Sequence, residues 1–308
     1  MPIHIVRRLL ESASRIILGK DHALRLALAC VLARGHLLIE DIPGVGKTTL
    51  AHVLARLLGL QFQRIQFTSD MLPADIIGVS IFDQRDASFR FHPGPVFSQL
   101  LLADEINRAT PKAQSALLEA MEERQISAEG RTWPLPEPFF VIATQNPADQ
   151  IGTFPLPESQ LDRFALVLSM GLPDRAAERE ILTGQGGNDV YEALRPVADP
   201  ARVAAAIAAV HGVYCAPALV EYVLDLTAAT RVHPDLSVGA SPRASVGLIE
   251  AARAHAVVVG RDHVTPDDVQ AVVGPAFSHR ISTGAGVDTA AGAAIVAGIV
   301  ARTSVPRP

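Results

Sequence analysis

A glycine-rich segment between a short apolar run and a helical pattern constrains the fold of this chain more than any other feature. The apolar run is residues 36–40, and the segment, the phosphate loop (residues 43–49), reads Pro43-Gly44-Val45-Gly46-Lys47-Thr48-Thr49. Glycines let the backbone fold tightly so that its N–H groups point at one anion, and the helix that follows adds the positive end of its dipole. The sequence therefore predicts a buried strand, a phosphate-binding loop and a helix over residues 47–58.

The loop carries the residue types that a nucleotide site needs. Lys47 can reach the β and γ phosphates, and the Thr48 hydroxyl can ligate magnesium. The usual pattern has a further glycine where this chain has Asp41, but the phosphate contacts depend on Gly44, Gly46 and the residues that follow them. We therefore predict that the loop binds a nucleoside triphosphate together with Mg²⁺.

An acidic pair, Asp104 and Glu105, ends a second apolar run over residues 100–103. A strand that ends in two acids places the first beside the metal ion and the second where it polarises an attacking water. Alone, such a pair is equally consistent with a solvated turn or a helix N-cap, but beside a phosphate loop it favours hydrolysis. The chain lacks the Asn-Lys-x-Asp signature that reads guanine, so we predict ATP as the nucleotide.

Apolar runs alternate with helical patterns over the first half of the chain. Strands are expected at residues 36–40, 62–67, 100–103, 139–143 and 165–168, with helices at residues 5–34 (broken near Gly19), 47–58 and 112–123. Short apolar strands between helices indicate a parallel sheet covered on both faces, so the predicted fold class is α/β. Two further segments, residues 78–92 and 126–134, read as β-hairpins inserted into this scheme.

The character of the sequence changes after residue 173. Alanine-rich helical patterns follow at residues 176–182, 200–211, 218–230, 243–258, 266–272 and 288–301. The glycine-rich residues 184–188 read as a flexible connection. We therefore predict an α/β core over residues 1–173 and a small all-α lid domain over residues 174–308.

Composition and charge limit the partners and the location. The 308 residues are 49% hydrophobic and carry a formal net charge of -5, and this acidic balance gives no reason to expect DNA or RNA as a partner. The start of the chain has no signal-peptide pattern, and the most apolar segment, residues 287–301, is shorter than the about 20 residues that span a bilayer. We therefore expect a soluble, cytoplasmic protein that does not enter a membrane.

Together these motifs resemble the AAA+ superfamily of P-loop ATPases and, more closely, its MoxR family. The resemblance is carried by residues 102–114, around the acidic pair, and by residues 152–164. The motifs run from Leu18 to Arg243, which is most of the chain. The resemblance implies an ATPase whose sites lie between the subunits of a homo-oligomeric ring, commonly a hexamer.

The resemblance also implies roles for single residues. Asn146 is similar to the polar sensor that positions the water, Arg163 to an arginine finger that reaches the γ-phosphate of the neighbouring subunit, and Arg243 to a second sensor that faces the phosphates from the lid. Ile17 and Gly19 match the segment that flanks adenine. The alternatives are a turn-capping asparagine, a surface salt bridge for Arg163, an ordinary arginine at a helix start, and a core role for Ile17.

These assignments make up the predicted site. The nucleotide-binding residues are Ile17, Gly19, Pro43, Gly44, Val45, Gly46, Lys47, Thr48 and Thr49. The magnesium ligands are Thr48 and Asp104. The catalytic residues are Glu105, Lys47, Asn146, Arg163 and Arg243.

The MoxR resemblance implies chaperone-like remodelling, assembly or maturation of client proteins, often with a partner that carries a von Willebrand factor A domain and, in several cases, with metal insertion. In related proteins the hairpins face the ring pore or the client, so Phe89, Arg90, Phe91 and Trp133 are either client contacts or cross-strand packing partners. Three other functions stay open. They are a magnesium-chelatase-like motor subunit, a nucleic-acid motor of the replicative-helicase type, and a nucleotide-dependent scaffold with little turnover.

Overall fold

The computed structural model of the chain describes residues 3–85, 87–128, 130–147, 152–184, 188–284 and 286–306. The helices are α1 (Ile3–Ser14), α2 (Asp21–Leu32), α3 (Lys47–Leu58), α4 (Pro73–Ile77), α5 (Pro111–Glu123), α6 (Glu158–Leu161), α7 (Arg175–Leu182), α8 (Asn188–Ala193), α9 (Pro200–Val210), α10 (Pro217–Arg231), α11 (Pro242–Val258), α12 (Pro266–Phe277) and α13 (Thr289–Arg302), with one 3₁₀ turn, η1 (Ile106–Arg108). The strands are β1 (Leu37–Glu40), β2 (Phe62–Gln66), β3 (Gly78–Asp83), β4 (Ser88–Pro93), β5 (Leu100–Asp104), β6 (Gln125–Ala128), β7 (Arg131–Pro134), β8 (Phe140–Gln145) and β9 (Leu166–Leu168).

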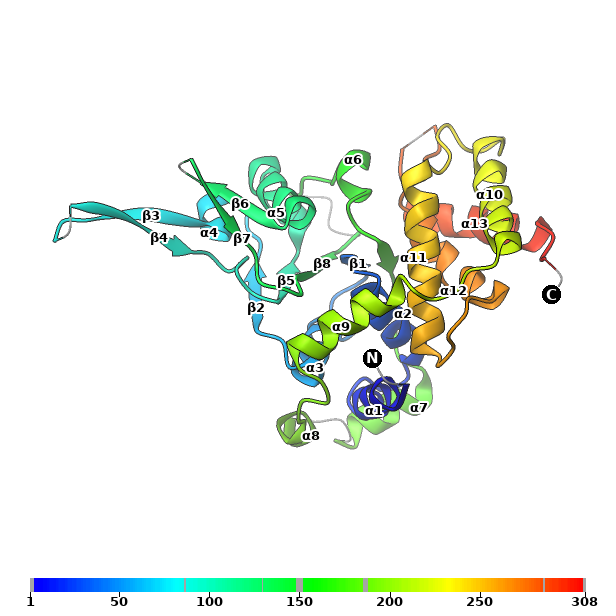
Figure 1. Ribbon diagram of the computed structural model, residues 1–308, viewed down its shortest axis with the longest axis horizontal. Helices are drawn as coiled ribbons and strands as arrows, with labels where there is room; N and C mark the ends of the chain where they lie inside the picture. Colours follow the sequence, from blue (N-terminus) through cyan, green and yellow to red (C-terminus); the bar gives the residue numbers. More distant parts are fainter. Residues whose placement is uncertain are drawn as a thin grey trace.

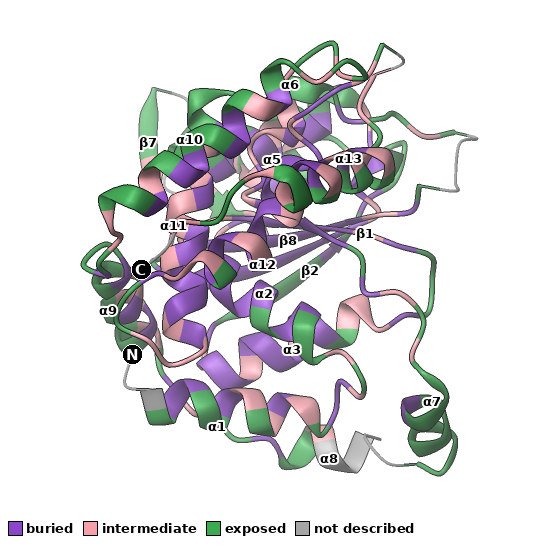
Figure 2. Cartoon of the chain, turned by 90° about the vertical axis from the view of Figure 1, so that its right-hand side faces the viewer, coloured by how far each residue is buried: buried purple, intermediate pink, exposed green. Residues whose placement is uncertain are grey.

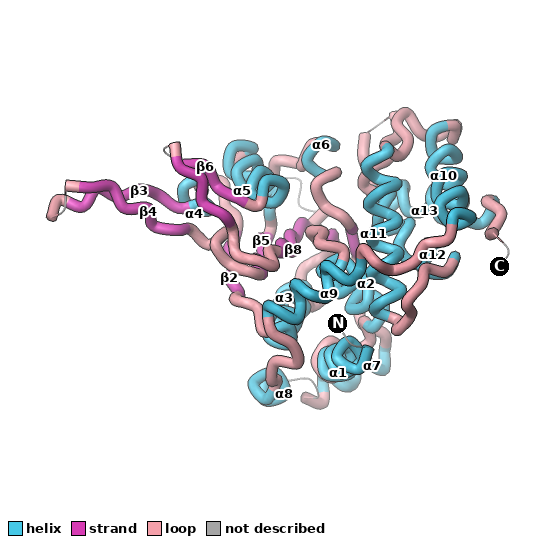
Figure 3. The backbone as a smooth tube through the Cα atoms, in the orientation of Figure 1, coloured by secondary structure: helices cyan, strands magenta, loops and turns pink. Residues whose placement is uncertain are grey.

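A five-stranded sheet forms the centre of the molecule, in the order β2-β5-β8-β1-β9 (Figures 1 and 3). All four pairings are parallel, and these are the five strands that the sequence predicts, so the α/β fold class is confirmed. The carboxyl ends of parallel strands meet at one edge of a sheet. Here that edge carries Glu40, Asp104 and Gln145, and the phosphate loop leaves from it.

Two hydrophobic cores lie on the two faces of the sheet, because successive side chains of a strand point to opposite sides. In β1, Leu37 and Ile39 belong to one core and Leu38 belongs to the other. The first core includes α2, α3 and the later helices, and the second includes α4 and α5. Figure 2 shows buried residues concentrated where α2 and α3 cover the sheet, whereas α7 is largely exposed.

Every element that the structure describes after β9 is a helix. Helices α11 and α12 pack against each other, and α11 also packs on α2 of the core. Helix α12 runs to Phe277, past the predicted end at residue 272, although it contains Pro275. Proline removes a helix hydrogen bond, but Ala276 and Phe277 are fully buried, and this packing keeps the turn helical. The division near residue 173 remains a prediction, and residues 185–187 of the expected flexible connection lie outside the described ranges.

Both inserted hairpins are present. Strands β3 and β4 pair antiparallel, and so do β6 and β7. They project from the sheet on the side away from α10 and α13 (Figures 1 and 3). Phe91 of β4 stacks on Trp133 of β7, with ring centroids 4.8 Å apart, so the hairpins touch each other. The turn residues Asp86 and Glu129 lie outside the described residues.

Three short helices, α4, α6 and α8, fall where the sequence predicts none. Each is too short to show a 3.6-residue apolar period, and α4 begins at Pro73, where a turn is the simpler expectation. Among the helices in the described ranges, none combines the length and apolar character needed to cross a membrane.

Candidate active site

The phosphate loop has the backbone that the glycines predict. Gly44 has φ 85° and Gly46 has φ 95°, a left-handed conformation that side chains with a Cβ rarely adopt. A Cβ built on Gly44 meets no atom within 4 Å, so the loop faces open space. Helix α3 begins at Lys47 and runs for 12 residues, and its first N–H groups can therefore serve an anion bound there.

Lys47 lies folded over the loop. Its Nζ donates to the backbone carbonyls of Asp41 at 2.5 Å and Ile42 at 3.2 Å. Burial lowers the pKa of Lys47, while nearby carboxylates, including those of Asp104 and Glu105, oppose the shift. The ammonium group thus sits within electrostatic reach of the acidic pair, and phosphate oxygens can replace the two carbonyls as its partners.

Asp41 fastens the loop to the chain beyond β9. Its Oδ2 accepts hydrogen bonds from the N–H groups of Met170 (2.7 Å) and Gly171 (2.6 Å) and from the Ser169 hydroxyl (3.0 Å). Its Oδ1 accepts from the N–H of Ile42. Burial alone would raise the pKa of Asp41, but these hydrogen bonds outweigh it and lower the pKa. An aspartate in the place of the usual glycine therefore has a structural role.

The buried carboxylate of Asp104 is held from two neighbouring strands. Its Oδ1 accepts from the Thr144 hydroxyl at 2.5 Å, and its Oδ2 lies 2.7 Å from the Arg64 guanidinium. Thr144 belongs to β8 and Arg64 to β2, the strands on either side of β5. The predicted metal ligand therefore has a fixed orientation and a cationic partner.

Glu105 is oriented by three groups. Gln66 donates an amide N–H to its Oε2 at 2.8 Å, and Arg108 Nε lies 2.9 Å from the same oxygen. Its backbone N–H donates to the Thr144 hydroxyl at 2.9 Å, and its φ of 56° turns the chain sharply after β5. The side chain that we predict to polarise water is thus already aimed by the protein.

Asn146 and the predicted adenine segment lie near the same sheet edge. Asn146 is buried directly after β8, the strand between β1 and β5. Ile17 is buried, and a Cβ on Gly19 would lie 2.9 Å from the Cβ of Ala177. Lys20 donates to the Leu172 carbonyl at 2.5 Å. Since the residues just before Leu172 bind Asp41, one short stretch connects this segment to the phosphate loop.

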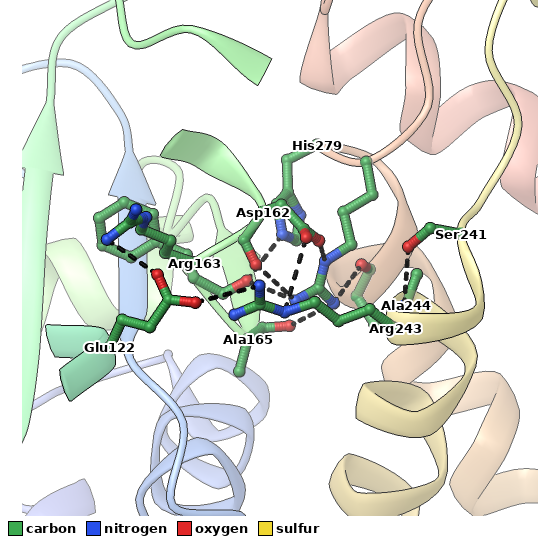
Figure 4. A network of polar contacts seen from close by, with 11 residues as sticks. Glu122, Asp162, Arg163, Ala165, Ser241, Arg243, Ala244 and His279 are labelled. Atoms are coloured by element: carbon green, nitrogen blue, oxygen red, sulfur yellow. Dashed lines mark hydrogen bonds and ion pairs between the residues drawn. The ribbon is translucent and has the colours of Figure 1, made fainter. Parts of the chain in front are cut away.

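Arg163 and Arg243 meet at one carboxylate (Figure 4). Arg163 Nη1 is 3.0 Å from Glu122 Oε2, and Arg243 Nη1 is 3.4 Å from Glu122 Oε1. Arg163 also donates to the Leu118 carbonyl at 2.7 Å, and Arg243 Nε lies 3.6 Å from Asp162 Oδ2. Within the described ranges, no hydrogen bond or ion pair joins either arginine to the phosphate loop. Arg243 therefore lies with Arg163, and its expected role as a second sensor that faces the phosphates stays a prediction.

The residues present suit a magnesium ion that binds with its nucleotide. The described residues contain no group of three or more His, Cys, Asp or Glu side chains arranged to hold a metal. Thr48 and Asp104 supply one hydroxyl and one carboxylate. Mg²⁺ commonly takes one or two protein ligands and completes its shell with phosphate oxygens and water, so this donor set fits.

The structure adds five residues to the predicted site: Asp41, Arg64, Gln66, Thr144 and Glu122. Side chains alternate along β2, so Arg64 and Gln66 lie on one side of the strand. Both are near its carboxyl end, and the carboxyl ends of parallel strands meet at one edge of the sheet. The pattern that predicted Asp104 could therefore have predicted both residues. Thr144 immediately follows the predicted strand end at residue 143 and could have been found in the same way. Glu122 gives no such signal, because its contact with Arg243 joins residues 121 positions apart.

Comparisons with known proteins identify relatives that cover most of the chain. A family model described as ATPase family associated with various cellular activities (AAA) matches residues 36–166, and an AAA lid domain model matches residues 228–299. The chain is 44% identical over 289 residues to Chaperone MoxR1 of Mycobacterium tuberculosis (strain ATCC 25618 / H37Rv), which covers 91% of this chain and 76% of that protein.

Two further relatives extend the comparison. The protein YeaC of Bacillus subtilis (strain 168) is 44% identical over 277 residues, or 90% of this chain and 87% of that one. The crystal structure of a predicted ATPase from Cytophaga hutchinsonii superposes with a TM-score of 0.88 at 33% sequence identity, over 99% of this chain and 96% of the other. The likeness thus extends over both the sheet and the later helices.

Proposed function

Because the chain belongs to the MoxR family of AAA+ ATPases, we propose that it hydrolyses ATP at sites shared between the subunits of a ring and uses the cycle to remodel client proteins. The observation that carries the proposal is the separation of its charged residues into two groups. The phosphate loop and the acidic pair lie at the sheet edge, whereas Arg163 and Arg243 are paired with Glu122 and contact no part of that loop within the described ranges. A complete site therefore takes its arginines from a second copy of the chain.

In the proposed mechanism, the loop amides and Lys47 bind the β and γ phosphates of ATP, and Thr48 and Asp104 hold magnesium. The metal, when bound, neutralises charge on the phosphate oxygens. Glu105 accepts a hydrogen bond from the attacking water and orients it toward the γ-phosphorus. The contacts that Gln66 and Thr144 make with the acidic pair support this role, since they fix the carboxylates before ATP arrives.

The neighbouring subunit completes the proposed site. Arg163 acts on the transition-state charge, a contribution of about 10³–10⁵ in rate for arginine fingers. Arg243 acts beside it on the same phosphates, because it shares Glu122 with Arg163. In a free subunit Glu122 pairs with both guanidinium groups, and phosphate oxygens replace it as their partner when a ring closes. Asn146 helps to position the water.

The proposed clients are proteins, and the inserted hairpins are the proposed client contacts. Ile81, Phe82 and Phe89 are about half exposed or more, at 51%, 49% and 66%. Large apolar side chains on a projecting hairpin are poorly placed for core packing and well placed for a partner. The name of the relative MoxR1, a chaperone, supports this direction. A hexameric ring and a partner with a von Willebrand factor A domain belong to the same proposal.

The first test measures steady-state ATP hydrolysis against protein concentration, with size-exclusion chromatography in the presence and absence of ATP. We expect specific activity to rise with concentration together with a shift to large assemblies. Glu105→Gln should bind ATP as the wild type does and lose turnover by about 10²-fold or more, since it removes the group that orients the water. If the protein stayed monomeric with ATP and its specific ATPase activity did not change with protein concentration, sites shared between subunits would be ruled out.

A second measurement tests action across the interface. Arg163→Ala supplies an intact phosphate loop, and Lys47→Ala supplies an intact arginine, so mixed rings should recover activity that neither protein has alone. The alternatives predict other results. A scaffold shows slow turnover that no added protein raises, and a magnesium-chelatase-like motor is stimulated only together with a metallation enzyme.

A further inference from the structure

One buried arginine of the later helices holds the finger segment, which we define as residues 161–165. Arg280 follows the end of α12, inside the range that the lid model matches, and its side chain is only 6% exposed. Its Nε lies 2.7 Å from Asp162 Oδ1. Its Nη2 donates to the backbone carbonyls of Asp162 at 3.1 Å and Phe164 at 2.9 Å, and Nη1 reaches the Ala165 carbonyl at 3.4 Å.

His279 strengthens the same attachment. Burial lowers the pKa of His279 to about 3, so the ring is neutral, and its Nε2 donates to the Phe164 carbonyl at 2.9 Å. Two consecutive residues at the end of α12 therefore bind the backbone on either side of Arg163. Figure 4 shows His279, Asp162 and Arg163 gathered in one network.

The chemistry of this contact favours arginine over any other side chain. A guanidinium group has five N–H donors in a fixed plane and can bind a carboxylate and several carbonyls at once. Burial lowers the pKa of Arg280, and the nearby Asp162 carboxylate opposes the shift. A buried ion pair often adds little stability compared with apolar packing, so the value of this one lies in the orientation that it fixes.

A second arginine of the same helical part reaches the same carboxylate. Arg243 Nε, at the start of α11, lies 3.6 Å from Asp162 Oδ2. Asp162, the residue directly before Arg163, thus contacts both the start of α11 and the residues that follow α12. A movement of these two helices relative to the sheet would act on the contacts that flank Arg163.

We propose that Arg280 is the positioning residue for Arg163, so that the lid of each subunit sets how well that subunit serves the site of its neighbour. The inference rests on the proposed function, in which Arg163 acts across the subunit interface. Arg280 touches neither nucleotide nor the reacting atoms in this scheme. It acts through Asp162 and the carbonyls of the finger segment.

The test uses Arg280→Lys, which keeps the positive charge but cannot bind Asp162 and three carbonyls together. We expect nucleotide affinity to be unchanged, since the phosphate loop of the same subunit is intact. The kcat should fall by about 10²-fold, the size expected when a catalytic group is displaced by about 1 Å. Arg261→Lys is the matched control, because Arg261 pairs with the buried Asp268 in the same helical part and makes no contact with the finger segment.

Mixed rings separate positioning from a general defect. Arg280→Lys has an intact phosphate loop, and Lys47→Ala has an intact Arg280 and Arg163, so their mixture should regain activity as the mixture of Arg163→Ala with Lys47→Ala does. A lid that is merely damaged would not be rescued in this way. Asp162→Asn, which removes the charged partner from a more exposed position, should repeat the result if Arg280→Lys does not fold.

The outcomes are distinct. Wild-type kcat in both Arg280→Lys and Asp162→Asn would overturn the inference and leave the proposed function standing. The inference would also be overturned, and the proposed function would stand, if Lys47→Ala restored activity to Arg163→Ala but not to Arg280→Lys or Asp162→Asn. No recovery in any mixture would overturn action across the interface, and with it both proposals. If kcat fell as much in Arg261→Lys as in Arg280→Lys, the loss would be explained by general damage to the lid, and the inference would be overturned.

Discussion

Two buried histidines are neutral rings in the folded chain near neutral pH. His36 Nδ1 accepts the Val141 N–H at 3.0 Å, and its Nε2 faces the Met121 carbonyl at 3.1 Å, so neither nitrogen has a lone pair free for a proton. His279 donates to the Phe164 carbonyl in similar fashion. Burial lowers the pKa of both rings to about 3. Residues of this kind make the stability of the fold depend on pH.

We expect the free energy of unfolding to fall as the pH drops below about 6.5, the histidine pKa of the unfolded chain. The unfolded chain takes up protons there and the folded chain does not, so the loss continues down to the folded pKa. Each histidine contributes at most about 1.4 kcal/mol per pH unit. His279→Gln keeps an N–H donor and cannot titrate, so it should show a smaller loss between pH values of about 7 and about 5.5 in urea titrations.

The control for this measurement is His4→Gln, which makes the same substitution at an exposed histidine. A wild-type slope in His279→Gln would mean that His279 does not carry the pH dependence. The quantity compared between the two variants is the change in the free energy of unfolding with pH, and not its value at a single pH.

The four residues at the heart of the site could be predicted from the sequence because each is fixed by its neighbours in the chain. Lys47 and Thr48 follow two glycines, and Asp104 and Glu105 end an apolar run. Arg280 could not be predicted, because its partners in the finger segment are 115 to 118 residues away. A single sequence holds no record of such a pairing.

Among the elements, the two hairpins act as one projecting unit because Phe91 and Trp133 stack on each other. The ring planes are 19° apart, and the T-shaped contact of Phe91 with Phe97 continues the cluster toward the core. The outer pair, Phe82 with Phe89, lies within one hairpin. The aromatic residues therefore divide into a bridging set and an exposed set.

Trp133→Ala should loosen the β3–β4 hairpin without changing basal ATP hydrolysis. An aromatic pair is worth about 0.5–1.5 kcal/mol beyond its buried area, so limited proteolysis of the hairpin should become about two- to tenfold faster when cleavage follows opening. Ile81→Ala truncates a half-exposed aliphatic side chain of the same hairpin that belongs to neither aromatic pair, and it should leave proteolysis much nearer the wild-type rate. Equal rates in Trp133→Ala and wild type would show that the stack does not hold the hairpins together.

The elements that could be predicted are those whose own residues decide their limits. Helix α3 starts and ends at the predicted residues because Gly46 and Gly59, both with positive φ, bound it. Helix α12 exceeds its prediction because tertiary burial of Phe277 overrides Pro275. The short α4 depends on packing against α5, and its five residues carry no periodic signal of their own.

In the whole molecule, Glu122 pairs with Arg163 and Arg243 within one subunit, so we expect it to oppose their contact with a neighbouring subunit. It is partly exposed and pairs with both, so in the proposed ring it competes with the phosphates of the neighbour. The sequence predicted the α/β sheet and the helical part, since both follow from local patterns. It did not predict that Arg243 and Arg163 share one acid, because that depends on how the helices pack against the sheet.

Glu122→Gln should lower the protein concentration at which specific ATPase activity is half-maximal. A partly exposed ion pair is worth up to about 1 kcal/mol, so we expect a shift of about two- to fivefold. Glu119→Gln removes the same charge one turn earlier on α5, and is expected to change the midpoint much less. A midpoint that moves upward in Glu122→Gln would mean that Glu122 orients the arginines for assembly instead of competing for them.

The path of the chain from the hairpins to Glu122 has a mechanical consequence. Strand β6 begins at Gln125, and only Arg124 separates it from the end of α5 at Glu123. The Phe91–Trp133 stack links the β3–β4 hairpin to β7, the partner of β6. A displacement of the two hairpins would therefore act on the end of α5, next to Glu122 and the two arginines that it pairs with. In the proposed ring, the resistance of a bound client to such a displacement would then limit the rate of the ATPase cycle.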